Sequence, residues 1–133
     1  MILVDPSVWI DYFNGHNTPQ VDALDQLLGT QTLAIGDIIL AEVLQGFRQD
    51  VDYLTARQLL TSLTTYNPLN VDLALKSADN FRNLRKRGIT VRKTVDVIIA
   101  TFWIEENHAL LFSDKDFILF VQYLGLNSVL AIN

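Results

Sequence analysis

The chain opens with Met1-Ile2-Leu3-Val4-Asp5-Pro6-Ser7, an apolar run that stops at an acid and a proline. Four consecutive apolar residues followed by such a break predict a short buried strand over residues 1–5. The stretch Ala109-Leu110-Leu111-Phe112-Ser113-Asp114 has the same pattern, which predicts a second buried strand over residues 109–113. Asp5 and Asp114 therefore both fall where a strand gives way to a loop, and we expect them at the carboxyl edge of one sheet.

The rest of the chain alternates between helical and strand-like patterns. Ser7 is a candidate N-cap for a helix that runs through residue 13, and Asp37, Asn70 and Thr94 are candidate caps of later helices. The further helices are expected at residues 20–28, 37–47, 51–63, 71–87, 94–107 and 116–123, and the further strands at 32–35 and 128–132. This order predicts an α/β fold, a three-layer sandwich with a central, mainly parallel sheet of about five strands flanked by helices.

Composition limits the class of protein. Half of the 133 residues are hydrophobic and 19% are charged, which indicates a single ordered domain over residues 1–133. Apolar runs are too short to span a membrane, and no signal peptide is expected at an N-terminus that lacks basic residues. The absence of cysteine excludes disulfides and thiolate metal sites, and it suits a cytoplasmic protein.

Two more acids lie in apolar surroundings. Glu42 lies within Ile38-Ile39-Leu40-Ala41-Glu42-Val43-Leu44, and Asp96 interrupts Val95-Asp96-Val97-Ile98-Ile99-Ala100. Taken singly, Asp5 can be a turn residue and Asp96 a first-turn helix acid. A buried carboxylate needs an oppositely charged partner, a metal ion or a proton, because burying an isolated charge costs roughly several kcal/mol. Four such acids on four elements predict one acidic pocket.

The same segments resemble the motifs of a known family. Val4-Asp5-Pro6-Ser7-Val8-Trp9-Ile10 looks like the opening of a PIN domain. Three later segments resemble its further motifs in order: Ala41-Glu42-Val43-Leu44-Gln45-Gly46, Thr94-Val95-Asp96-Val97-Ile98-Ile99-Ala100 and Phe112-Ser113-Asp114-Lys115-Asp116-Phe117. The resemblance spans essentially the whole chain, and the size fits the VapC-type toxins of toxin–antitoxin pairs.

This resemblance implies a Mg²⁺- or Mn²⁺-dependent endoribonuclease that a VapB-like antitoxin inhibits, with transfer or ribosomal RNA loops as the substrate. It assigns the acidic tetrad to Asp5, Glu42, Asp96 and Asp114, with Ser7 as a supporting ligand or an N-cap. Asp116 is an alternative to Asp114, which we favour because it comes directly off the strand.

Four carboxylates in one pocket need a counter-charge, and all-oxygen ligation suits Mg²⁺ or Mn²⁺. As a hypothesis, Asp5, Asp96 and Asp114 coordinate the main ion. Glu42 then orients or deprotonates the attacking water, or binds a second ion. Hydrolysis by water would leave a 5′-phosphate and a 3′-hydroxyl.

Six of the ten basic residues fall between positions 82 and 93, namely Arg82, Arg85, Lys86, Arg87, Arg92 and Lys93. A basic strip beside an acidic metal pocket suits a phosphodiester substrate. Arg85, Lys86, Arg92 and Lys93 are therefore candidate RNA contacts, and an acidic antitoxin segment is a second candidate for the same groove. The basic residues of the predicted helix over residues 71–87 can equally be solvated side chains at the end of that helix, where the helix dipole favours positive charge. Surplus apolar surface between Ile38 and Leu60 suggests a homodimer or an antitoxin groove.

Three alternatives remain at this stage. A non-toxin PIN nuclease of RNA processing has the same motifs. A phosphatase or receiver domain also places acids at strand ends, although Asp5-Pro6-Ser7 lacks the second acid that the phosphatase needs and Glu42 and Asp96 are predicted in helices. A binding-only module is expected to have lost some of these acids.

Overall fold

A parallel five-stranded sheet forms the centre of the protein, as the alternating pattern predicts. The computed structural model describes residues 1–131. The strands are β1 (Ile2–Val4), β2 (Leu33–Gly36), β3 (Thr64–Tyr66), β4 (Ala109–Leu111) and β5 (Asn127–Ser128). They are arranged in the order β3-β2-β1-β4-β5, and every neighbouring pair is parallel. The strand predicted at 128–132 is thus shorter and begins one residue earlier, and residue 132 lies outside the described residues.

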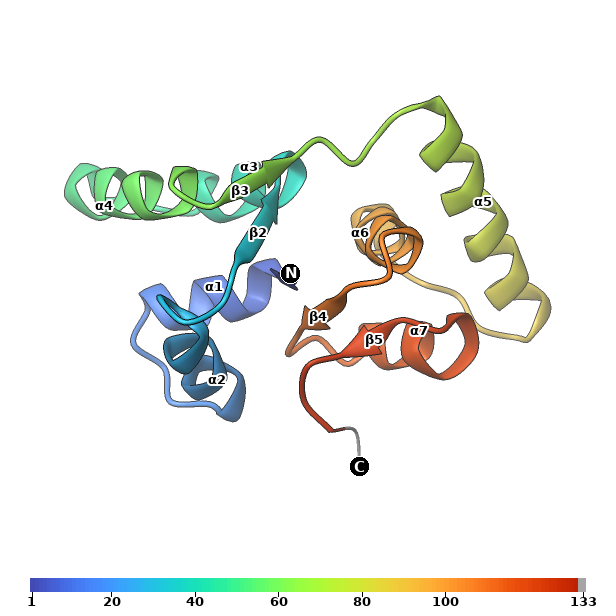
Figure 1. The fold of residues 1–133 in the computed structure, drawn as a ribbon. Coiled ribbons are helices and arrows are strands. Elements are labelled where there is room, and N and C mark those ends of the chain that lie inside the picture. Colours follow the sequence, from blue (N-terminus) through green and yellow to red (C-terminus); the bar gives the residue numbers. More distant parts are fainter. Residues whose placement is uncertain (132–133) are drawn as a thin grey trace.

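Helices cover both faces of this sheet (Figure 1). The helices are α1 (Pro6–Phe13), α2 (Pro19–Leu27), α3 (Asp37–Gln45), α4 (Asp50–Thr61), α5 (Val71–Lys86), α6 (Thr94–Glu105) and α7 (Asp116–Leu124). Helices α1 to α4 lie on one face and α5 to α7 on the other (Figure 1). This division follows from right-handed crossovers, because the strand order runs outward from β1 in both directions. The three-layer α/β prediction is confirmed.

The strand order reverses at the neighbouring strands β1 and β4. Strands β2 and β3 lie on the far side of β1, and β5 lies on the far side of β4. In open parallel sheets a ligand binds outside the carboxyl ends of the strands at such a reversal. Asp5 follows β1, and Ser113 and Asp114 follow β4, so both lie at this edge. The fold therefore brings together two acids that are more than one hundred positions apart in the sequence.

The core consists of the apolar strand residues and one side of each helix. Its largest fully buried side chains include Trp9, Trp103, Phe117 and Phe120. In the part of the chain that is described, no helix is both long and apolar enough to cross a bilayer.

Three helices have N-cap residues other than those predicted. Asp5, not Ser7, caps α1: its carboxylate accepts the Ser7 N–H, and Pro6 occupies the first helical position, where a missing N–H costs nothing. Lys93 and Gly36 are the N-cap residues of α6 and α3, so Thr94 and Asp37 are their first helical residues instead. Asn70 caps α5 as predicted, because its side chain accepts the Leu73 N–H at 2.8 Å.

Candidate metal centre

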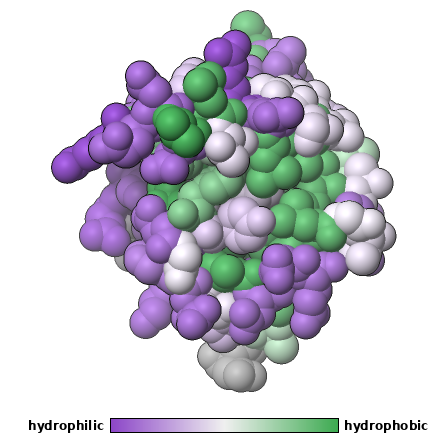
Figure 2. Space-filling model, turned by 90° about the vertical axis from the view of Figure 1, so that its left-hand side faces the viewer, coloured by the Kyte–Doolittle hydropathy of each residue, from purple (hydrophilic) through white to green (hydrophobic). Residues whose placement is uncertain are grey.

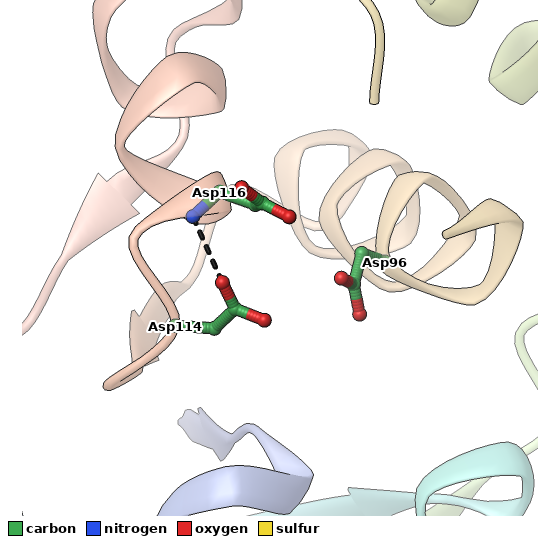
Figure 3. Close-up of side chains that lie close together, drawn as sticks. All are labelled: Asp96, Asp114 and Asp116. Carbon is green, nitrogen blue, oxygen red and sulfur yellow. Dashed lines mark hydrogen bonds between the residues drawn. The ribbon is translucent and has the colours of Figure 1, made fainter. Parts of the chain in front are cut away.

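Three carboxylates meet at the carboxyl edge of the sheet. Asp96 lies in the first turn of α6, Asp114 lies in the loop after β4, and Asp116 begins α7. Each of them offers an oxygen that lies within 4.8 Å of the oxygens of the other two. Figure 3 shows the three side chains directed toward one another from the two sides of a small space. Among residues 1–131, this is the acidic group whose spacing suits a metal ion.

Asp96 is the buried member of this group. It is only 6% exposed, and its Oδ2 atom is buried without a hydrogen-bond donor. Burial, the largest cause, and the negative charges of neighbouring acids together raise the pKa of Asp96 to about 6, although Lys93 lowers it; these acids are Asp114, Asp5 and Glu42. Because this buried oxygen accepts no hydrogen bond, it can serve as a metal ligand.

Asp114 and Asp116 are joined to each other. Oδ1 of Asp114 accepts the backbone N–H of Asp116 at 3.0 Å, which fixes the turn between β4 and α7 (Figure 3). Oδ2 of Asp114 stays directed to the site, 4.0 Å from Nζ of Lys93. The structure therefore places both acids of this segment beside Asp96.

Asp5 lies behind this group and is held by the protein itself. Its Oδ1 accepts hydrogen bonds from the Ser7 N–H at 2.6 Å and from the Ser7 hydroxyl at 2.7 Å. Its Oδ2 accepts the Ser113 N–H at 3.0 Å, which connects the end of β1 to the loop that carries Asp114. Burial raises the pKa of Asp5, these hydrogen bonds lower it, and the charge of Asp114 raises it. Asp5 thus bonds both to the start of α1 and to the loop after β4, and Ser7 is one of its donors.

Glu42 is the least closely placed of the predicted tetrad. It is half-buried on α3, and its charge is felt at Asp96, where it contributes to the raised pKa. Within residues 1–131 it is not a member of the three-carboxylate group. Glu42 thus lies near enough to affect the pKa of Asp96 from the opposite helical layer, but outside the group of three aspartates.

The two cations before α6 pair with the acids. Nζ of Lys93 lies 4.0 Å from Asp114, and the guanidinium of Arg92 lies 3.8 Å from Asp116. Both side chains are largely exposed, so these pairs are weak and can be exchanged for other partners. From the sequence we predicted both residues as RNA contacts, but no sequence pattern indicated that they also form ion pairs with the acids of this group.

The oxygens available here fit a hard divalent cation. The group consists of carboxylates alone, one oxygen is buried and has no hydrogen-bond partner, and the negative charge of Asp114 raises the pKa of Asp96. Mg²⁺ and Mn²⁺ prefer such oxygen ligands, and a bound cation removes the repulsion between the three charges. Asp96, Asp114 and Asp116 are thus candidate ligands for a metal ion.

Comparison with known proteins agrees with this geometry. The PIN domain family model matches residues 2–120. The chain belongs to the PIN-domain family. The PIN match and the helical positions of Glu42 and Asp96 leave no place for the receiver and phosphatase alternatives.

Among similar sequences are VapC ribonuclease Mb1587 of Mycobacterium bovis and ribonuclease VapC11 of Mycobacterium tuberculosis. Each is 31% identical over 122 residues, which cover 88% of this PIN domain and 89% of the relative.

Solved structures share the fold. VapBC2 from Rickettsia felis, bound to a DNA fragment from its promoter, has a TM-score of 0.74 at 20% identity over 96% of this chain and 97% of that chain. VapC20 of Mycobacterium tuberculosis, described as a toxin that cleaves the sarcin-ricin loop, has a TM-score of 0.65 at 17% identity over 90% and 94%. A toxin–antitoxin complex from Klebsiella pneumoniae has 0.73 at 20% identity over 99% and 100%.

Proposed function

We propose that this PIN domain is a metal-dependent endoribonuclease, the toxin of a toxin–antitoxin pair. The observation that carries the proposal is the group of Asp96, Asp114 and Asp116, whose carboxylate oxygens lie within 4.8 Å and include one buried, unpartnered atom. Relatives with 31% identity over most of the chain are named as ribonucleases, which supports RNA as the substrate.

The residues have separate parts in this proposal. Asp96, Asp114 and Asp116 would hold Mg²⁺ or Mn²⁺, which when bound lowers the pKa of a coordinated water and neutralises charge on the phosphate. Asp5 keeps the loop of Asp114 in place through Ser113, and it has a remaining lone pair on Oδ2. Glu42, across from the three aspartates, orients or deprotonates the attacking water, or supports a second ion. The products are a 5′-phosphate and a 3′-hydroxyl.

The basic strip supplies the contacts to the RNA backbone. Arg92 and Lys93 already lie within 4.0 Å of site carboxylates, so a bound phosphate would meet them as it reaches the acids. Arg85 and Lys86 are exposed at the end of α5 and extend the strip. Such contacts make RNA affinity depend steeply on salt.

An apolar face supports the proposal of a protein partner. Figure 2 looks at the side of the molecule where α4 lies and shows apolar surface framed by hydrophilic residues. A hollow on α1 and α3 is lined by Ile10, Phe13, Val43 and Phe47, and Ile10 is exposed. A VapB-like antitoxin is the partner we propose for this face, because several structural neighbours are complexes of toxin with antitoxin.

A homodimer is a further expectation. Val71 and Leu75, in the first turns of α5, expose large apolar side chains to solvent, and a second copy would cover them. We also keep the cytoplasm as the expected location, because the proposed RNA substrate and the lack of cysteine both suit it.

The test is cleavage of total RNA by purified protein without antitoxin, in Mg²⁺, in Mn²⁺ and in excess EDTA. Asp96→Asn removes the buried ligand, and Asp79→Asn, an exposed aspartate on α5, is the matched control. We expect discrete fragments with 5′-phosphates for the wild type and Asp79→Asn, and no fragments with EDTA or Asp96→Asn. Cleavage that survives both EDTA and Asp96→Asn would contradict the proposal.

A further inference from the structure

A cavity of about 450 Å³ lies between α5 and α6, beside the metal centre but separate from it. Its apolar walls are formed by Leu69, Ala74, Ala78, Phe81, Val97 and Ile98. The two helices are joined to each other by a hydrogen bond between Asn80 and Thr101 and an ion pair between Lys76 and Glu105. The cavity is therefore part of a fixed helix pair.

Three polar side chains also line this cavity, namely Ser77, Arg82 and Thr94. Ser77 is only 6% exposed, and its hydroxyl is buried without a hydrogen-bond partner. A buried hydroxyl without a hydrogen-bond partner destabilises the protein, so a ligand that forms a hydrogen bond with it would be favoured. Apolar walls with a few converging polar groups are typical of small-molecule sites.

The cavity lies next to the proposed point of cleavage. Thr94 precedes Asp96 by two residues, which is about 3 Å along the axis of α6. The side chain of Asp96 is directed toward Asp114 and Asp116 (Figure 3), whereas Val97 and Ile98 line the cavity on the α5 side. One turn of α6 thus contributes to both sites on neighbouring faces.

The chemistry of the walls suits a nucleobase. Phe81 offers an aromatic surface, and the guanidinium of Arg85 lies 5.6 Å from the centre of its ring. Unpaired RNA bases stack on aromatic side chains and bond through their polar edges, for which the Ser77 hydroxyl and Thr94 are available. The exposed cation of Arg82 is placed for the phosphate that accompanies the base.

We propose that the cavity between α5 and α6 binds one unstacked RNA base beside the cleaved phosphodiester and thereby helps to select the cleavage site. The inference rests on the proposed ribonuclease function. Charge favours RNA over a second copy of the chain as the occupant. Arg82 lines the cavity and is part of the same strip as Arg92 and Lys93, so a polyanion is attracted where a second identical strip would be repelled.

The experiment uses saturation-transfer NMR on the full chain in EDTA, with the four ribonucleoside 5′-monophosphates as probes and ribose 5-phosphate as the probe without a base. Ala78→Phe fills the cavity from an exposed helical position, and Asn83→Phe, also exposed on α5 but outside the cavity, is the matched control. We expect saturation of base protons for at least one nucleotide, an affinity at least tenfold lower in Ala78→Phe, and no change in Asn83→Phe.

Equal competition by ribose 5-phosphate, or undiminished binding to Ala78→Phe, would overturn the proposal. So would a drop in oligomeric size in Ala78→Phe, measured by sedimentation, without nucleotide binding to the wild type, because a second copy would then cover the cavity. Wild-type protein that cleaves RNA but binds no base contradicts the base site alone. Base binding without any RNA cleavage would contradict the nuclease proposal and support the base site.

Discussion

Replacing Asp96 by Asn is predicted to stabilise the metal-free protein at neutral pH, although it removes a proposed metal ligand. The change keeps the shape of the side chain and removes its charge, so it resembles the protonated acid. The wild-type carboxylate is buried among other acids, and its pKa is raised from an ordinary 3.8 to about 6. At roughly 1.4 kcal/mol for each tenfold change in proton affinity, this corresponds to about 3 kcal/mol.

The sign of the pH dependence follows from the raised pKa. The folded state binds this proton more tightly than the unfolded state does, so folding stability falls as pH rises from 3.8 to about 6 and then stays constant. Asp96→Asn avoids this loss. Its free energy of unfolding should exceed that of the wild type by about 3 kcal/mol at pH 7.5 and by less than about 1 kcal/mol at pH 4.

The assay is urea unfolding in EDTA at these two pH values. Asp22→Asn is the control, because Asp22 is an exposed acid in the first turn of α2, where loss of the charge costs about 0.5 kcal/mol through the helix dipole. Added Mg²⁺ should reverse the order, since it stabilises the folded wild type and not the variant. A variant that is no more stable than the wild type at pH 7.5, or equally stabilised at pH 4, would refute the reasoning.

Three further predictions concern single groups. Asp5→Ala should lower the free energy of unfolding by about 2–4 kcal/mol, because it removes the α1 cap and leaves buried N–H groups unpaired; a urea midpoint equal to the wild type would contradict this. Gly125→Ala should cost about 1–2 kcal/mol, because Gly125 has φ of 80°, whereas Gly46→Ala at the end of α3, with φ of −80°, should cost less in the same measurement. Lys93→Gln should raise the pKa of Asp96, because the positive charge of Lys93 lowers it. A carboxyl ¹³C titration of Asp96 that shows no rise would contradict this charge effect.

The strands that carry the site were predictable because their signal is local. Ile2–Val4 and Ala109–Leu111 are apolar runs that end at an acid, and a buried parallel strand produces that pattern. Strand β3 gave no such signal, because Thr64 and Thr65 are exposed at the edge of the sheet. The site could be placed at the carboxyl edge for the same local reason.

The contacts within the site could not be predicted, because they depend on tertiary packing. The bond from the Ser113 N–H to Asp5 joins residues 108 positions apart, and no spacing rule indicates it. The sequence treated Asp114 and Asp116 as alternatives, yet the turn between β4 and α7 directs both to Asp96. The pairing of Arg92 and Lys93 with these acids likewise follows from where α6 begins.

We propose that Asp96, Asp114 and Asp116 bind a divalent metal ion. The most direct test is anomalous diffraction from crystals of the protein soaked in Mn²⁺, with crystals of Asp96→Asn as the comparison. We expect an anomalous peak within coordination distance of these carboxylates in the wild type and none at that place in the variant. A peak elsewhere, or an empty site in wild-type crystals at saturating Mn²⁺, would contradict it.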